Sequence, residues 1–128
     1  MNKLVLAAGL VLGMAVPAFA ADPVEGVWQT QVDDGAYAYV TIAPCGTKIC
    51  GHISRTFNET GEYKSKNLGL KLVWDMAAAG GGKYKGGRIY QPSTGKTFKS
   101  KMALNGDILN VSGCVGPICK KQVWALVK

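Results

Sequence analysis

Few residues of this chain have a type and spacing suited to chemistry. His52 is its only histidine, and no second strong metal ligand lies at a useful distance from it in the sequence. The plain expectation for His52 is therefore a solvent-exposed or strand-paired imidazole. Asp75 beside Trp74 could present a carboxylate near the mouth of a β-barrel, or it could cap a turn. Because no acid and base are paired, the sequence indicates no catalytic residue, metal or cofactor, and an enzyme ranks third, behind the two functions given below.

The four cysteines form two pairs with C-x4-C spacing, Cys45 with Cys50 and Cys114 with Cys119. Each pair brackets a four-residue turn, so we favour two local disulfides that fix the register of two hairpins. The other two connectivities stay open at this point. A four-cysteine zinc site also stays open, although such sites usually have C-x2-C spacing.

The N-terminal residues predict export. Lys3 precedes an apolar run, and the small residues Ala18 and Ala20 fit cleavage of a signal peptide after Ala20. The run is shorter than the about 20 residues of a transmembrane helix, so we expect no transmembrane segment. We expect residues 1–20 to be removed and residues 21–128 to form one periplasmic or secreted domain, in which cysteines are oxidised.

The composition is basic. The 128 residues include 15 Lys and Arg against 8 Asp and Glu, which gives a net charge of +7. Such an excess usually belongs to a solvated outer surface. The alternative is that it attracts an anionic envelope component such as lipid head groups or glycans. Export argues against nucleic acid as a partner. The excess is concentrated in Lys83, Lys85, Arg88, Lys96, Lys99, Lys101, Lys120 and Lys121.

Apolar and polar residues alternate along most of the chain, which predicts an all-β fold. About eight short antiparallel strands are expected, and closure into an up-and-down barrel would leave no unpaired edge. Two stretches, 58–67 and 77–82, interrupt the alternation and are expected to be mobile loops. The predicted strands are 25–32, 37–44, 49–57, 69–76, 83–90, 97–104, 107–114 and 119–127.

Hairpin geometry sorts the last three predicted strands into two faces. A two-residue turn at Asn105-Gly106 would place Leu104 opposite Asp107, and the Cys114–Cys119 turn would place Leu109 opposite Trp124. The outer face would carry the lysines. The expected inner face consists of Phe98, Met102, Leu104, Leu109, Val111, Trp124 and Leu126.

The inward face is harder to assign for the hairpin predicted from strands 37–44 and 49–57. Pairing Cys45 with Cys50 would place Val40 opposite Arg55 on an aliphatic face that we expect to point inward. An inward Arg55 would then need a charged partner or a water-filled cavity.

Several segments resemble known proteins. Gly26-x-Trp28 resembles the glycine-x-tryptophan signature of lipocalins, in which the tryptophan closes one end of the barrel. Almost the whole mature chain is similar to the exported bacterial domain-of-unknown-function family twenty-one forty-seven. That resemblance implies a lipocalin-like β-barrel in the periplasm or outside the cell, and it brings no established activity. The segments that carry it are 26–28, 50–53, 73–76, 86–92, 95–98, 111–114 and 122–124.

Two functions follow as hypotheses. In the first, the protein is a binding module whose barrel interior accepts a small apolar or amphipathic ligand. In the second, the barrel is filled, and the protein acts in the envelope through its basic outer face and the stretch 58–67. The candidate ligand-binding residues are Trp28, Trp74, Asp75, Phe98, Met102, Leu109, Val111 and Trp124.

Overall fold

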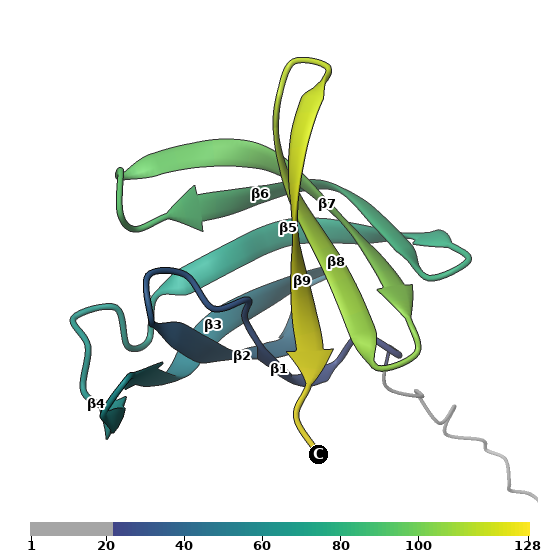
Figure 1. Ribbon diagram of the computed structural model, residues 1–128. Coiled ribbons are helices and arrows are strands. Elements are labelled where there is room, and N and C mark those ends of the chain that lie inside the picture. Colours follow the sequence, from purple (N-terminus) through teal and green to yellow (C-terminus); the bar gives the residue numbers. More distant parts are fainter. Residues whose placement is uncertain (1–21) are drawn as a thin grey trace, which may run out of the picture.

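The computed structural model describes residues 22–128, so the predicted signal peptide and its cleavage site lie outside the described residues. The described chain is built from strands and turns (Figure 1). None of its segments forms a helix long and apolar enough to cross a membrane. The strands are β1 (Gly26–Gln29), β2 (Tyr37–Cys45), β3 (Lys48–Asn58), β4 (Gly61–Tyr63), β5 (Lys71–Gly80), β6 (Lys83–Gln91), β7 (Lys96–Asn105), β8 (Ile108–Val115) and β9 (Ile118–Leu126).

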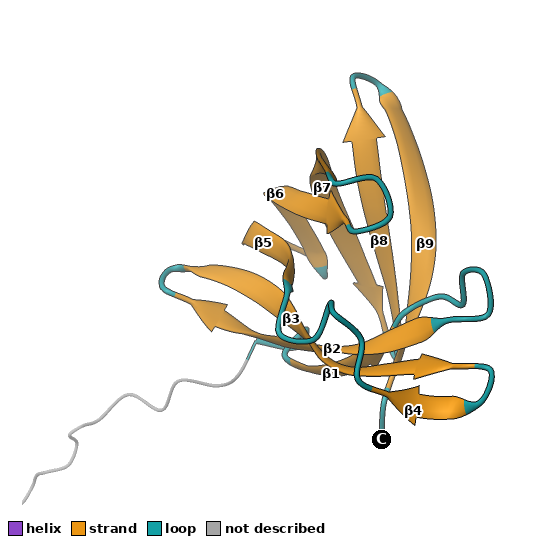
Figure 2. Cartoon of the chain, turned by 90° about the vertical axis from the view of Figure 1, so that its left-hand side faces the viewer, coloured by secondary structure: helices purple, strands orange, loops and turns teal. Residues whose placement is uncertain are grey.

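Eight of the strands form a closed antiparallel barrel. Each strand pairs with the next one along the chain, with β4 passed over between β3 and β5, and β9 returns to pair with β1. Figure 2 shows the sheet curling around so that β1 and β2 meet β9. The predicted all-β up-and-down barrel is therefore confirmed. Closure pairs the backbone groups that the edge strands of an open sheet would leave unpaired.

The ninth strand, β4, was not predicted. It pairs only with the last residues of β3, where Asn58 lies opposite Gly61 and Thr56 lies opposite Tyr63. The stretch 58–67 is therefore partly a short hairpin, and its description as a loop was wrong. The prediction of a mobile loop at 77–82 was also wrong. Ala77 and its neighbours continue β5 along β6, and only two glycines form the turn.

The register of the β8–β9 hairpin is as predicted. Cys114 lies opposite Cys119, and Leu109 lies opposite Trp124. Both local disulfides are present, Cys45–Cys50 and Cys114–Cys119, which confirms the favoured pairing.

The β7–β8 register differs from the prediction. The two turn residues are Gly106 and Asp107, not Asn105 and Gly106, so Leu104 lies opposite Leu109 instead of Asp107. Gly106 has a φ of 62°, and a glycine as the first turn residue is the arrangement of a type II′ turn. Each partner moves by two positions, so the same side chains still face inward.

Arg55 does not lie inside the barrel, and the prediction that placed it opposite Val40 was wrong. Cys45 lies opposite Lys48 and not opposite Cys50, so the register of β2 with β3 differs from the prediction by two positions and Val40 meets Ile53. A bulge between Tyr39 and Val40 then places Arg55 opposite Tyr39. Arg55 is exposed, where it forms a salt bridge with Glu62 of β4. The hydrogen bond to Glu62 raises the pKa of Arg55, and the same bond lowers the pKa of Glu62.

Candidate functional site

The barrel interior is filled by the protein's own side chains. Ring systems and aliphatic groups from opposite walls meet in one buried cluster. Of the predicted ligand-binding residues, five lie in that cluster with exposed fractions of 2% or less, and Phe98 packs against it half-buried. The five are Trp28, Met102, Leu109, Val111 and Trp124.

The polar groups of the interior already have partners. The indole Nε1 of Trp28 donates to the carbonyl oxygen of Val24 at 2.9 Å, and that of Trp124 donates to Oε1 of Gln122 at 2.6 Å. Within the described residues, every buried side-chain nitrogen or oxygen has a hydrogen-bond partner. A polar ligand group that entered the barrel would find no unpaired donor or acceptor waiting for it.

Glycines at inward positions show how tightly the interior is packed. A Cβ atom added to Gly87 would lie 2.5 Å from Sδ of Met76 and 2.7 Å from the carbonyl oxygen of Trp74. A Cβ on Gly51 would lie 2.8 Å from a methyl carbon of Val40. Neighbouring side chains occupy the space that these two glycines leave. The glycines therefore permit close packing and do not create a cavity.

Trp74 and Asp75 lie apart from the other predicted site residues, and their placement in the barrel interior was wrong. Trp74 pairs with Arg88 on the outer face of β5 and β6, and Asp75 is exposed. Asp75 has a φ of 59°, and Gly86, in the part of β6 between Lys85 and Arg88 that faces it, has a φ of 77°. Val73 and Met76 are both completely buried although they lie three residues apart, so the alternation of β5 is interrupted between them.

Trp74 contributes to a shallow hollow on the outside of the barrel. This hollow has a volume of about 360 Å³, and the side chains of Leu70, Lys71 and Tyr90 complete its lining. His52 lies nearby in the register, opposite Lys71, and is exposed as predicted. Among residues 22–128, no three His, Cys, Asp or Glu side chains gather as a metal-binding group.

A larger hollow, of about 570 Å³, lies over β6 to β9, and we call it the lysine hollow. Lys83 and Lys85 come from β6, Lys101 from β7 and Lys121 from β9. All four lysines are exposed, and no Asp or Glu belongs to the lining. The remaining lining residues are Ala79, Tyr84, Met102, Ala103, Asn110 and Ser112.

Strand register explains why the lysines meet. Ser112 lies between Lys101 on β7 and Lys121 on β9, so the two lysines are two strands apart on one face, about 10 Å at the backbone. Ala103 sits beside Lys83 in the adjacent row. Small side chains make the floor and long cationic ones make the walls, which creates a concave surface of positive potential.

The sequence showed these lysines as a basic excess but not as a site. Alternation correctly put Lys101, Ser112 and Lys121 on the outer face. The signal that could have identified the hollow is the distribution of charge along the chain. Residues 76–128 contain nine Lys and Arg but only one acidic residue, whereas residues 22–75 contain five Lys and Arg and seven acidic residues.

Comparison with solved structures supports the fold. The chain is similar to a protein from Helicobacter pylori, HP1028, which is described as belonging to the lipocalin family. The two share 20% sequence identity with a TM-score of 0.68, over 82% of this chain and 83% of the other. A likeness at this identity shows the fold alone.

Sequence comparison identifies the family. No curated protein sequence matches the chain significantly. The profile of a bacterial family described as "Uncharacterized protein conserved in bacteria (DUF2147)" matches residues 26–125, which cover the barrel from β1 nearly to the end of β9. The chain therefore belongs to the DUF2147 family and has the lipocalin-like barrel that its sequence predicted.

Proposed function

We propose that the protein is an exported binding module that holds a small amphipathic anion in the lysine hollow, on the outside of its barrel. The observation that carries this proposal is the convergence of four lysines on one hollow whose lining contains no acidic residue. Its volume, about 570 Å³, falls within the range of small-molecule sites, about 300–1,000 Å³. The lipocalin-like fold is consistent with a role in binding small molecules.

Electrostatics favours an anion there. Four ammonium groups within one concave surface repel one another, and the described residues form only two salt bridges, neither of which involves these lysines. A phosphate or carboxylate bound between Lys101 and Lys121 would offset that repulsion. The Ser112 hydroxyl lies between these two lysines, and the Asn110 amide lies between Ala103 and Val123; both can donate hydrogen bonds.

Apolar surface at the floor favours an amphipathic ligand over a simple ion. Ala79 and Ala103 belong to the lining beside the lysines. An alkyl chain lying on them would remove apolar surface from water, at about 25 cal/mol per Å². The buried cluster that fills the interior supports this placement, and both hollows described above lie outside the barrel.

Calorimetric titration with matched probes tests the proposal. The probes are octyl phosphate, octanol, which lacks the charge, and inorganic phosphate, which lacks the tail. We expect octyl phosphate to bind most tightly and the double variant Lys83→Gln, Lys101→Gln to bind it about tenfold more weakly. Lys121 stays unchanged because it also lies near the end of the β8–β9 hairpin.

The matched control is Lys64→Gln, Lys66→Gln, which removes the same charge from two exposed lysines outside the hollow. It should bind octyl phosphate like the unaltered protein. Equal affinity for octanol and octyl phosphate, insensitive to Lys83 and Lys101, would contradict the proposal and favour a ligand inside the barrel.

A further inference from the structure

The β8–β9 hairpin extends beyond the rest of the barrel and ends in an apolar tip. Figure 1 shows it projecting past the neighbouring strands. The last residue of β8 that pairs with β7 is Cys114, and β9 meets β1 only near its other end, at Ala125 and Leu126. The tip, which we define as residues 115–118, therefore has no neighbouring strand on either side.

The two large tip side chains are the most exposed large hydrophobic residues of the described chain. Val115 is 66% exposed and Ile118 is 72% exposed, and they lie opposite each other across a turn made by Gly116 and Pro117. Two adjacent exposed apolar side chains rimmed by polar residues form the kind of patch through which proteins contact membranes or other proteins.

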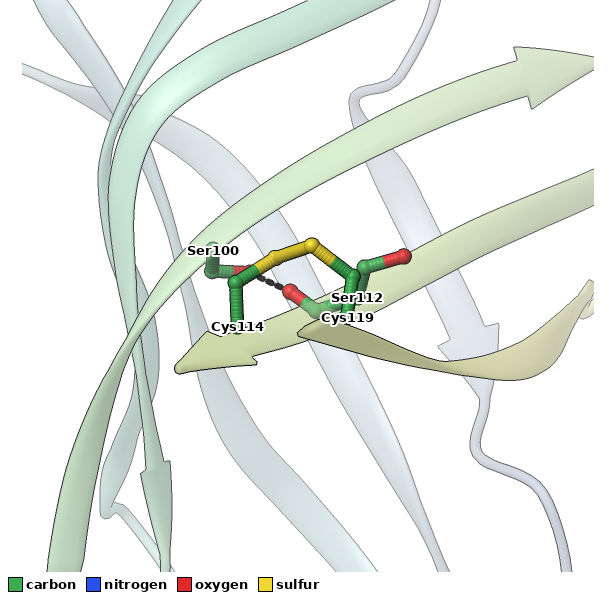
Figure 3. Close-up of a disulfide and its surroundings, with 4 residues drawn as sticks. All are labelled: Ser100, Ser112, Cys114 and Cys119. Atoms are coloured by element: carbon green, nitrogen blue, oxygen red, sulfur yellow. Dashed lines mark hydrogen bonds between the residues drawn. A yellow bond between two sulfur atoms is a disulfide. The ribbon is translucent and has the colours of Figure 1, made fainter. Parts of the chain in front are cut away.

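A disulfide and a hydrogen bond stabilise the hairpin next to the tip. The Cys114–Cys119 disulfide crosses the hairpin directly below it (Figure 3). One step further down, the Ser100 hydroxyl donates to the carbonyl oxygen of Ser112 at 2.6 Å and ties the hairpin to β7. The apolar side chains are thus presented on a braced hairpin, so little ordering is needed before they bind.

Basic side chains surround the base of the tip. Lys99 lies opposite Cys114, Lys120 lies opposite Gly113, and Lys121 is the next residue of β9. All three lysines are exposed, and none of them forms a salt bridge within the described residues. Apolar side chains at the tip could contact the acyl chains of an anionic bilayer, while the lysines at its base contact the phosphates at the bilayer surface.

From these contacts we infer that the protein docks on the surface of an anionic phospholipid bilayer through its β8–β9 tip. Val115 and Ile118 enter the boundary between head groups and acyl chains, while Lys99, Lys120 and Lys121 contact phosphates. The uneven distribution of charge along the chain favours this orientation on an anionic surface. Residues 76–128, which include the tip, contain nine Lys and Arg and one acidic residue. Docking stands on the tip and does not require a ligand in the lysine hollow.

Vesicle flotation tests the inference with the protein expressed from its complete coding sequence. Its intact mass is measured first, because a retained N-terminal apolar run would bind vesicles regardless of the tip. We expect flotation with vesicles of phosphatidylethanolamine and phosphatidylglycerol, and little with phosphatidylcholine alone. The variant Val115→Asp, Ile118→Asp should reduce the floated fraction about tenfold.

The matched control is Ile108→Asp, at the other end of β8, where the side chain is 39% exposed. It should float like the unaltered protein, and thermal unfolding of all variants would show that they fold. Flotation that does not depend on phosphatidylglycerol, or that survives the double tip substitution, would overturn the inference. A dimer in sedimentation that the tip substitutions dissociate, without vesicle binding, would overturn it in favour of a second copy of this chain.

The same tip variant separates this inference from the proposed function. Octyl phosphate binding should be unchanged in Val115→Asp, Ile118→Asp, since neither residue lines the lysine hollow. Failure of docking would then leave ligand binding standing, and failure of ligand binding would leave docking standing.

Discussion

The hydroxyl of Tyr84 in β6 donates a hydrogen bond to Oδ1 of Asp22, a residue 62 positions earlier in the chain. This contact fastens the N-terminal segment across one end of the barrel. Between them, Val24 is completely buried and accepts the indole hydrogen bond of Trp28. The buried ring of Trp28 is thus held at this end of the chain by the residues just before it.

Stability at alkaline pH should depend on Tyr84. Burial, followed by the hydrogen bond to Asp22, raises the pKa of Tyr84 above its ordinary value of 10.0. A raised folded-state pKa stabilises the fold fully below the unfolded pKa, and this contribution is lost as pH rises above about 10. Urea unfolding between neutral and strongly alkaline pH should show this loss.

The variant Tyr84→Phe isolates this contribution. At neutral pH it should unfold about 1 kcal/mol more easily, because the hydrogen bond to Asp22 is missing. Its stability should also decline less than that of the unaltered protein above pH 10. Parallel pH profiles for the two proteins would show that Tyr84 does not carry the effect.

Substitution of the inward glycines should reveal how full the barrel is. Gly87→Ala would push a methyl group into Met76 and the Trp74 carbonyl, and we expect a loss of about 2–3 kcal/mol in the free energy of unfolding. Gly113→Ala is the milder comparison, because its Cβ would lie 3.3 Å from a methyl carbon of Ile89. If both substitutions are neutral in urea unfolding, the interior has free space and the filled-barrel account fails.

Opening the Cys114–Cys119 disulfide should loosen the hairpin without unfolding the barrel. The bond closes a short loop, so replacing both cysteines by serine should cost about 2 kcal/mol of stability. The expected readout is a lower Tm together with faster amide exchange confined to the ends of β8 and β9. Unchanged exchange at residues 115–118 would show that the bond does not brace the tip.

The prediction from sequence succeeded for the register of the β8–β9 hairpin, whereas at the similar turn between β2 and β3 Cys45 lies opposite Lys48 and not Cys50. The β8–β9 pairing of Leu109 with Trp124 follows from counting outward from a glycine turn that the disulfide marks. At β7–β8 the same count began one residue too early, yet the faces survived because pairing errors of two positions preserve the pleat.

The errors occurred where bulges interrupt alternation. A bulge beside Val40 placed Arg55 outside the barrel. Trp74 and Asp75, predicted from a family-like segment, lie outside where β5 departs from regular strand geometry at Asp75. Such irregularities depend on contacts between strands that are far apart in sequence, as Met76 over Gly87 shows. The lysine hollow was missed for a related reason, since it forms only when several neighbouring strands bring their outer faces together.

Binding of an amphipathic anion should weaken with salt. Between about 0.05 M and 0.5 M salt, the affinity for octyl phosphate should fall about tenfold, because the lysines of the hollow are exposed and are screened. In the Lys83→Gln, Lys101→Gln variant the dependence on salt should be shallower. An affinity that rises with salt would indicate that burial of the alkyl chain dominates and that the lysines do not hold the ligand.

The most direct test of the central claim is a methyl NMR titration of the protein with octyl phosphate. Methyl groups of Ala79 and Ala103 report on the lysine hollow, whereas those of Leu109 and Val111 lie buried inside the barrel. We predict saturable shifts at the two alanines and almost none at the two interior residues. Larger shifts at Leu109 and Val111 than at the alanines would contradict the account and place the ligand within the barrel.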